Sequence, residues 1–229
     1  MNIYIGYDPK YPKVYGACTN SIFRNTNSPS FYTVTPLDQQ KLRDSKVYWR
    51  EEDDRASTPF SLTRFLVPLL NGYNGWALYC DSDFIFLDDI SNLLALKDDS
   101  KAVMVVQHDY EPKPGFKMNR KVNHSYRRKN WSSLMMFNNS KCQNLTLDYV
   151  NTAHGLDLHQ FKWASNVGEL PKTWNWLADE YEYKEDVSNI HFTLGGPWFH
   201  DGIGSYNKSD YENTWKKYHE ECTSYTSQT

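Results

Sequence analysis

The sequence predicts an α/β protein with a mainly parallel central sheet and helices on both faces. Short apolar segments typical of buried strands alternate with segments whose apolar residues recur at helical spacing. This alternation is typical of parallel sheets, because a parallel connection needs a crossover long enough to hold a helix. The 229 residues suit one large or two small domains, and 39% hydrophobic with 23% charged residues is a globular composition. A single domain spanning residues 1–229 fits this length, and two small domains are the alternative at this point.

The first expected element is a strand rather than a signal peptide, because the segment MNIYIGYD lacks a basic start and a long apolar core. In order, we expect a strand at 2–7, a helix at 12–23, a strand at 31–37 and a helix at 58–70. Thr58 is a typical N-cap residue, and Pro59 follows it at the first helical position. We expect Pro68 to kink this helix and Gly72 to end it.

The second part of the chain continues the alternation. We expect a strand at 76–83, a short helix at 91–96, strands at 102–107 and 131–138, helices at 145–151 and 158–164, then short strands and loops to residue 200 and a polar C-terminal tail. Asp88 and Asp89 precede the short helix, so we expect them to cap it.

Two acids, Asp81 and Asp83, interrupt an apolar run in the stretch LYCDSDFIFLDDI. A carboxylate is costly to bury unless it is paired or bound to a cation. Residues two apart in a strand point to the same side, so both acids are expected on one side of a strand end. In such sheets ligands bind beyond the carboxyl ends of the strands, where Asp8 also falls. The pair therefore predicts a hard oxygen site for Mn²⁺ or Mg²⁺, although a solvated acidic turn has the same sequence.

The overall charge and the cysteines restrict the partners. A formal charge of −3 argues against a general nucleic-acid binder, and no apolar run approaches the length of a membrane span. The four cysteines are scattered, and Cys18 and Cys80 lie in apolar patterns that suggest buried thiols in a reducing cytosol. We expect a cytoplasmic protein and leave homo-oligomerisation open.

Several segments resemble one known family. The stretch SLTRFLVPLLNGYNGWALYCDSDFIFLDDI resembles the donor-binding half of GT-A glycosyltransferases of family 8, the glycogenin and bacterial galactosyltransferase type. The stretch HFTLGGPWF resembles the same family's His-Phe-x-Gly…Pro-Trp segment, and QHDYEPK, RKNWSSLMMFNN and LDLHQFKW look like small bacterial and phage members. The resemblance implies a GT-A type nucleotide-diphospho-sugar transferase sandwich. It also implies a donor-binding half at about 1–90 and an acceptor-side half at about 91–205.

The resemblance implies a donor site around a metal ion. Asp81 and Asp83 would be metal ligands, with His191 as the third, whose imidazole favours Mn²⁺ over Mg²⁺. The remaining residues placed at the donor by resemblance are Tyr7, Asp8, Arg64, Ser82, Gly195, Gly196 and Trp198. From the residues alone, four of these have other readings: Asp8 as a turn former, Arg64 as an exposed helix charge, and Gly195 and Gly196 as a turn without a ligand. A packed histidine is the other reading of His191.

Two segments depart from the family pattern. Ser132 and Ser133 fall where the family has an Asn-Ala or Asn-Ser pair at the donor sugar, and structural strand serines are an equal alternative. Gln160 matches the Gln of the family's Asp-Gln pair, but His159 replaces the Asp. Asp157 is a candidate to take over that role. We expect Gln160, Asp157 and Arg64 to be the catalytic residues.

The resemblance implies transfer of a hexose, glucose or galactose, from a UDP-sugar to a saccharide or glycoconjugate acceptor, with retention of configuration. A metal-dependent phosphoesterase using the two acids, with His108, Asp109 and His124 as further ligands, is one alternative. An inactive GT-A-like protein that binds sugar or nucleotide is another.

We expect the acceptor to bind between the donor segments, where aromatic residues accompany basic ones. The residues in question are Lys117, Arg120, Arg127, Arg128, Trp131, Trp163, Trp174 and Trp176. Aromatic faces beside basic groups suit a sugar, including one with an acidic group. A solvated basic loop and a Trp-rich core are the plainer readings.

Overall fold

The computed structural model describes residues 1–51, 58–110, 116–117, 121–122, 127–178, 180–199 and 211–226. Its central sheet has the strand order β2-β1-β3-β8-β5-β9. The strands are β1 (Asn2–Tyr7), β2 (Thr33–Asp38), β3 (Trp76–Cys80), β5 (Val103–Val105), β8 (Leu134–Asn138) and β9 (Val167–Glu169). β1 pairs in parallel with β2 and β3, and β5 with β9, whereas β8 is antiparallel to both of its neighbours. The predicted mainly parallel α/β sheet is thus confirmed, with β8 as the reversed strand.

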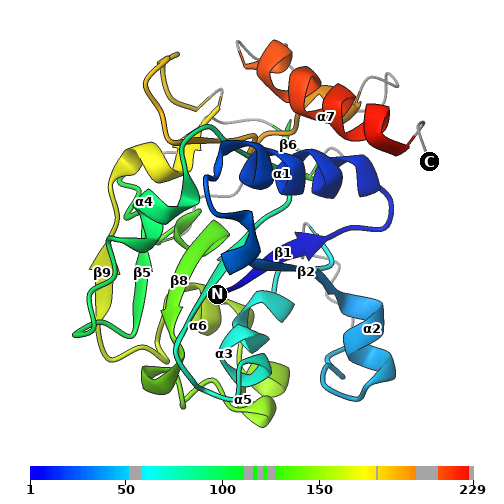
Figure 1. Ribbon diagram of the computed structural model, residues 1–229. Coiled ribbons are helices and arrows are strands. Elements are labelled where there is room, and N and C mark those ends of the chain that lie inside the picture. The colour runs from blue at the N-terminus through cyan, green and yellow to red at the C-terminus, as the bar shows by residue number, and fades with distance from the viewer. Residues whose placement is uncertain are drawn as a thin grey trace.

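Helices cover both faces of this sheet, as predicted (Figure 1). On one face, α1 (Pro12–Asn25) packs Cys18 and Ile22 in the same core as Ile3 and Ile5 of β1. On the other face, Tyr4 of β1 lies in a second core with residues of α3 (Val67–Leu70), α5 (Leu147–Thr152) and α6 (Gly155–His159). This division follows from the strand period, because successive side chains of β1 point to opposite faces. α2 (Gln39–Asp44) follows β2 directly, with Asp38 as its N-cap.

Two smaller sheets complete the described part. β4 (Phe84–Phe86), β11 (Asn189–His191) and β10 (Trp176–Leu177) form a three-stranded sheet, and β6 (Phe116–Lys117) pairs with β7 (Lys121–Val122). Residue Phe84 lies opposite His191 in the antiparallel β4–β11 ladder. The chain therefore moves from the central sheet to the smaller sheet between the end of β3 and the start of β4.

The C-terminal segment contains a helix that the sequence analysis did not predict. In place of a polar tail, α7 (Glu212–Thr226) packs alongside α1 (Figure 1). Trp215 and Tyr218 of α7 are buried in a third core with Val14 and Ala17 of α1. An ion pair of 3.2 Å between Arg24 and Glu221 joins the two helices at the surface.

Two predicted helices differ from the structure. The segment 58–70 is a turn followed by a 3₁₀ helix over Thr63–Leu66 and the short α3, so Thr58 does not cap a continuous helix. Pro68 has no N–H to donate to an upstream carbonyl and is accepted here at the second position of α3, while Gly72 follows with φ +57. The helix expected at 158–164 instead ends at His159, because Phe161 has φ +59, outside the right-handed helical region.

Two predicted strands are shorter than expected. The strand 76–83 ends at Cys80, so Asp81 and Asp83 lie in the turn between β3 and β4. The strand 131–138 begins at Leu134, because Asn130 has φ +62 and a 3₁₀ turn covers Trp131–Ser133. The short helix α4 (Ile90–Leu94) is as predicted, and the Asp89 side chain caps it by accepting from the Ser91 N–H at 2.8 Å.

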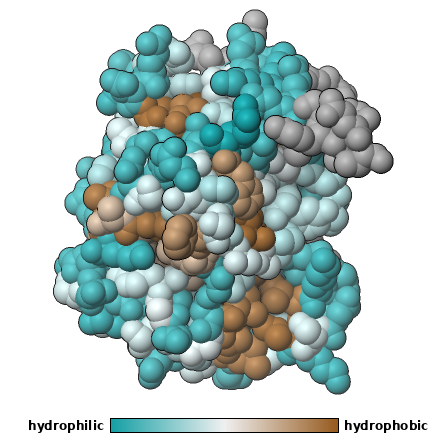
Figure 2. Space-filling model, in the orientation of Figure 1, coloured by the Kyte–Doolittle hydropathy of each residue, from teal (hydrophilic) through white to brown (hydrophobic). Residues whose placement is uncertain are grey.

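Cys18 and Cys80 are buried free thiols, as predicted, and so is Cys142. Among the helices that the structure describes, none has both the length and the apolar character needed to cross a membrane. On the face drawn in Figure 2, hydrophobic residues appear in separate areas between hydrophilic ones.

Replacing Trp215 by Ala should destabilise the protein by about 3–5 kcal/mol. This side chain is buried and its ring centroid lies 5.5 Å from that of Trp198, so the substitution leaves a large cavity between α7 and the small sheet. Urea unfolding followed by circular dichroism measures the loss. Trp49→Ala is the control, because Trp49 is 48% exposed and its loss should change stability by about 0.5 kcal/mol or less. Equal unfolding midpoints for the two variants would contradict the packing of α7.

Candidate active site

The two acids stand at the turn where the chain leaves one sheet for the other. The Asp81 N–H donates to the Ser133 carbonyl at 2.9 Å, which extends the β3–β8 pairing by one bond. On the other side of the turn, the Asp83 carbonyl accepts from the Phe192 N–H at 2.9 Å, which ties Asp83 to the end of β11. Each acid is therefore fixed by a different sheet, and the same-side argument from strand spacing was wrong in its reason although both carboxylates reach one site.

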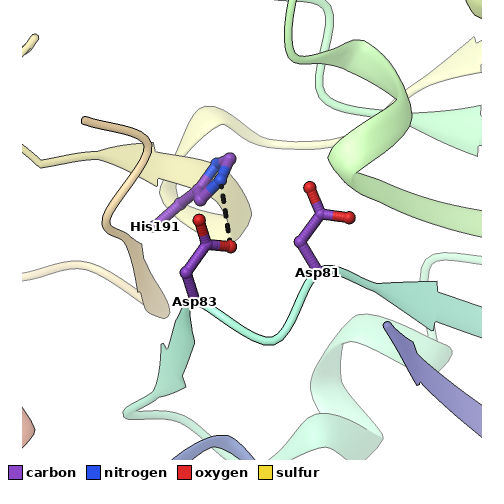
Figure 3. A group of neighbouring side chains, drawn as sticks. All are labelled: Asp81, Asp83 and His191. Atoms are coloured by element: carbon purple, nitrogen blue, oxygen red, sulfur yellow. Dashed lines mark ion pairs between the residues drawn. The ribbon is translucent and has the colours of Figure 1, made fainter. Parts of the chain in front are cut away.

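His191 completes the group that the sequence predicted. Asp81, Asp83 and His191 offer ligand atoms that all lie within 4.8 Å of one another. Figure 3 shows the two carboxylates at the ends of the turn, with the imidazole beside Asp83. The His191 Nε2 atom is 3.4 Å from Asp83 Oδ1, and both side chains are largely buried. His191 is held there by β11, and its ring stacks on Phe84 at 4.3 Å between centroids.

The orientation of His191 is set by Asn175. The Asn175 Oδ1 atom is 2.9 Å from His191 Nδ1, and its Nδ2 donates to Ser133 Oγ at 2.8 Å. Because an amide oxygen only accepts, Nδ1 carries a hydrogen, and Nε2 is the ring nitrogen that faces Asp83. A histidine that ligates a metal is commonly held by such a bond from its other nitrogen.

Neighbouring protein groups balance the negative charge of Asp81 more fully than that of Asp83. Arg64 Nη2 lies 2.9 Å from Asp81 Oδ1, and the Tyr79 hydroxyl donates to the same oxygen at 2.6 Å. Burial raises the pKa of Asp81, and the Arg64 guanidinium opposes that rise. Burial likewise raises the pKa of the Tyr79 hydroxyl well above its usual value, so Tyr79 remains a donor. By contrast, the buried Asp83 Oδ1 accepts no hydrogen bond in the described structure.

These features fit a divalent cation. Two carboxylates and one imidazole nitrogen are a donor set suited to Mn²⁺, and oxygens alone suit Mg²⁺. A buried carboxylate oxygen that accepts no hydrogen bond is unfavourable, and a cation between Asp83 Oδ1 and His191 Nε2 would give both atoms a partner. Asp81, Asp83 and His191 could therefore hold a metal ion.

The residues expected at the nucleotide lie at the same edge of the sheet. Tyr7 ends β1, which runs parallel to β3, and its half-buried ring meets Tyr15 edge-on at 5.5 Å. The Asp8 carboxylate accepts from the Lys10 N–H at 2.9 Å, which is the turn-forming role that the sequence left open. Ser82 is buried between the two acids.

Arg64 is not an exposed helix charge. It is 5% exposed and donates to the Ser132 carbonyl at 2.8 Å as well as to Asp81. The guanidinium also lies over the Tyr79 ring at 5.1 Å. These contacts place Arg64 directly against one member of the carboxylate pair.

The glycine segment after β11 makes a close turn around Trp198. Gly195 has φ +110, a conformation that favours glycine. A Cβ on Gly196 would lie 2.2 Å from the Trp198 ring, so this glycine is required for packing. Trp198 is 4% exposed and packs against Phe192 and Trp215. The structure thus gives Gly196 and Trp198 a packing role, and their donor-site role stays a prediction.

Three residues of the segment around Gln160 have different partners. Asp157 forms an ion pair of 2.6 Å with Lys162 at the surface of α6. His159 instead has Nδ1 2.8 Å from Ser132 Oγ, beside the carbonyl that Arg64 binds. The Gln160 carbonyl accepts from Arg128. The structure therefore links His159 more directly than Asp157 to the Arg64–Asp81 pair, and the catalytic roles of Gln160 and Asp157 stay predictions.

The residues expected at the acceptor divide into two groups. Trp163 and Trp174 are buried in the cores, as the plainer reading of a Trp-rich core predicted. Trp131 and Trp176 are half-buried, and Arg127 is exposed. Arg120 and His124 lie outside the described residues, and only the backbone of Lys117 is described.

Sequence reasoning missed Asn175 and Tyr79, the hydrogen-bond partners of His191 and Asp81. Tyr79 had a usable signal, because it precedes Asp81 by two residues and the β3–β8 pairing continues to the Asp81 N–H, so the two side chains point to the same side. Asn175 had none, because its position depends on pairing between β10 and β11.

Comparison with known proteins places the chain in a family. No model of a known protein family matches it. Over 208 residues the chain is 41% identical to Protein CDI of Arabidopsis thaliana, in a match that covers 87% of this chain and 80% of that protein. The chain belongs to the family of Protein CDI.

Solved structures with the same fold are glycosyltransferases. The bifunctional glycosyltransferase WbbM matches 98% of this chain with a TM-score of 0.63 and 14% identity, and the chain spans about half (51%) of WbbM. The galactosyltransferase LgtC, solved in complex with donor and acceptor sugar analogs, matches 96% of both chains with a TM-score of 0.59 and 11% identity. At these identities the likeness shows the fold, which is the GT-A fold that the sequence predicted.

Replacing Asn175 by Leu should weaken Mn²⁺ binding about 10–100-fold, because His191 loses the acceptor that holds its Nδ1–H and directs Nε2 to Asp83. Isothermal titration of the metal-free protein with Mn²⁺ gives the affinity directly. Asn175→Asp keeps an acceptor at this position and should retain most of the affinity. If the Leu variant is folded by circular dichroism and binds Mn²⁺ as the wild type does, Asn175 does not position His191.

Proposed function

We propose that the protein is a metal-dependent glycosyltransferase that moves a hexose, glucose or galactose, from a UDP-sugar to a saccharide or glycoconjugate acceptor. The proposal includes Mn²⁺ (or Mg²⁺) as cofactor, retention of configuration, assignment to family 8 and a cytoplasmic location. It treats residues 1–229 as one catalytic domain. The donor-binding half is 1–90 and the acceptor-side half is 91–205, with His191 reaching the donor site from the second half.

One observation carries the proposal. The group Asp81, Asp83 and His191 lies at the carboxyl end of β3 in a GT-A fold, and this is the edge at which ligands of open α/β sheets bind. A nucleoside diphosphate gains negative charge as it leaves the sugar, and a divalent ion supplies the positive charge that stabilises it. Hard carboxylate oxygens beside one imidazole are suited to hold such an ion against phosphates.

The other residues have roles consistent with this chemistry. Arg64 favours the ionised form of Asp81 and holds the carboxylate in place through its bonds to it. Tyr7 presents an aromatic ring at the end of β1 where a uracil can stack, and Asp8 lies beside it. Gln160 and Asp157 are proposed to bind the sugar hydroxyls. Retention is proposed to follow attack by the acceptor hydroxyl from the face that the nucleotide leaves, with the departing phosphate accepting the proton.

A panel of nucleotide sugars, each with Mn²⁺ and with EDTA, tests the proposal by nucleotide release. We expect UDP release from UDP-glucose or UDP-galactose that depends on the metal, because donor hydrolysis needs only donor, metal and water. Release of phosphate from a generic ester, without nucleotide-sugar turnover, would instead identify a phosphoesterase. Sugar binding that persists in EDTA without any turnover would identify an inactive binding protein.

Replacing Asp83 by Asn should abolish the part of UDP affinity that depends on Mn²⁺, a loss of about tenfold or more, because the charge facing His191 is removed while the shape is kept. Calorimetric titration with UDP, with and without Mn²⁺, measures this loss. Asp148→Asn, on an exposed acid of α5, is the matched control. Asp81→Ala is a less informative variant, since it removes the carboxylate that pairs with the buried Arg64 and should cost about 3–5 kcal/mol of stability. Unchanged metal-dependent affinity in Asp83→Asn would remove the metal assignment.

UDP should bind more tightly than GDP or ADP, by about tenfold, because the strand-end position at Tyr7 and Asp8 suits a pyrimidine. Tyr7→Ala should reduce the affinity for UDP and narrow this preference, because the stacking surface is lost. Competition titrations with the three nucleotides in Mn²⁺ give the ranking, and Tyr183→Ala, on a residue 53% exposed elsewhere, is the control. Tighter GDP binding would redirect the proposal to a GDP-sugar donor.

A further inference from the structure

A cleft of about 530 Å³ is lined by residues other than Asp81, Asp83 and His191 and has no role in the site described so far. Its walls include two aromatic residues, Tyr110 and Trp131, and the consecutive basic residues Arg127 and Arg128. The two acids Asp109 and Glu169 also line it. The wall is therefore a mixture of aromatic faces, guanidinium groups and carboxylates.

Hydrogen bonds connect this cleft to His191. The Asn130 Nδ2 atom donates to the Tyr110 hydroxyl at 2.7 Å and to Thr193 Oγ1 at 3.3 Å, two residues beyond His191. The Asn130 carbonyl accepts from the Ser133 hydroxyl at 2.7 Å and from Asn175 Nδ2 at 3.4 Å. Because Asn175 also holds His191, a short hydrogen-bonded path joins the wall of the cleft to the metal-binding group.

The aromatic wall is rigid and partly accessible. Trp131 donates its indole N–H to the His108 carbonyl at 2.9 Å, which fixes the ring, and the side chain is half-buried. Behind it, the His108 ring is buried with Nδ1 2.7 Å from the Tyr181 hydroxyl. Burial, with His191 and Lys172 nearby, lowers the pKa of His108 to about 3, so this residue adds no positive charge to the cleft.

The two arginines differ in their availability. The Arg128 guanidinium lies 5.2 Å from the centre of the Trp131 ring and donates to the Gln160 carbonyl, so it is largely committed to the wall. Arg127 is exposed, and no hydrogen bond or ion pair to it is found among the residues that the structure describes. Arg127 can therefore offer its planar set of N–H donors to a ligand, and such a set matches a carboxylate or a phosphate.

We propose that this cleft binds an acidic saccharide, a sugar carrying a carboxylate or a phosphate group, as the acceptor of the transfer reaction. This inference rests on the proposed function. The sugar ring would pack on Trp131, its hydroxyls would donate to Asp109 and Glu169, and its acidic group would bind Arg127. The two carboxylates suit sugar hydroxyls because each oxygen accepts hydrogen bonds, while repulsion from them confines the acidic group to the Arg127 side of the cleft.

The test measures saccharide binding directly and needs no knowledge of the donor sugar. The full chain, with UDP and Mg²⁺ present, is titrated at constant ionic strength with glucuronate, glucose 6-phosphate and glucose, followed by NMR. At least one acidic sugar should bind about tenfold more tightly than glucose. Arg127→Ala should bring that affinity close to the affinity for glucose, while Arg127→Lys should retain part of it. Lys97→Ala, on an exposed cation outside the cleft, should change nothing.

The two acidic probes distinguish a carboxylate from a phosphate as the acidic group of the acceptor. Tighter binding of glucuronate indicates an acceptor with a uronate, and tighter binding of glucose 6-phosphate indicates a phosphorylated acceptor. Equal affinities for all three sugars, no binding of any of them, or a preference that survives Arg127→Ala would each overturn the inference. Binding of UDP with Mg²⁺, measured in the same samples, separates this failure from that of the proposed function. If UDP binds and the acidic sugars show no preference, the acceptor assignment alone is wrong.

Discussion

The site depends on holding two carboxylates close together in a largely buried turn. Two such charges repel each other, and each loses hydration, so the protein must compensate both. It does so for Asp81 with Arg64 and Tyr79, but it leaves Asp83 with an oxygen that accepts no hydrogen bond in the described structure. Because of this difference, a positive charge placed on the side of Asp83 and His191 would stabilise the turn. A cation bound between Asp83 and His191 would supply that positive charge.

The surrounding structure supports this arrangement from both sheets. Asp81 is tied to the central sheet through Ser133, and Asp83 to the small sheet through Phe192. The Ser133 hydroxyl also accepts a hydrogen bond from Asn175, which in turn holds His191. Ser133 therefore fixes both the main chain of Asp81 and the residue that orients the histidine. The position of each ligand therefore depends on packing between the sheets, which the core around Ile85, Ile190 and Trp198 maintains together with α1 and α7.

The sequence was informative wherever local pattern decides the structure. β1, α1, the cap at Asp89 and the acid pair followed from apolar periodicity and from the cost of burying a carboxylate. The association of His191 with the acids came from resemblance, because nothing in local spacing relates residues so far apart in the chain. The helix α7 was missed because its composition is largely polar, and only two aromatic residues, Trp215 and Tyr218, bury its inner face. The break at Phe161 needs a positive φ angle at a bulky aromatic residue, which no sequence pattern indicates. Asn130 also has a positive φ angle, and asparagine adopts this conformation more often than most residues.

The segment around Gln160 departs from the family 8 pattern that the sequence resembles. His159 stands where an acid was expected and is hydrogen-bonded to Ser132, whose carbonyl binds Arg64. At the same time Asp157 is paired with Lys162. An imidazole at that position leaves this segment with fewer carboxylates than the resemblance to family 8 implies. The second half of the chain instead supplies acids and arginines in the neighbouring cleft. Selectivity is then expected to depend more on that cleft than on the segment around Gln160, because the cleft contains the side chains whose charge and shape differ most from those of a neutral sugar site.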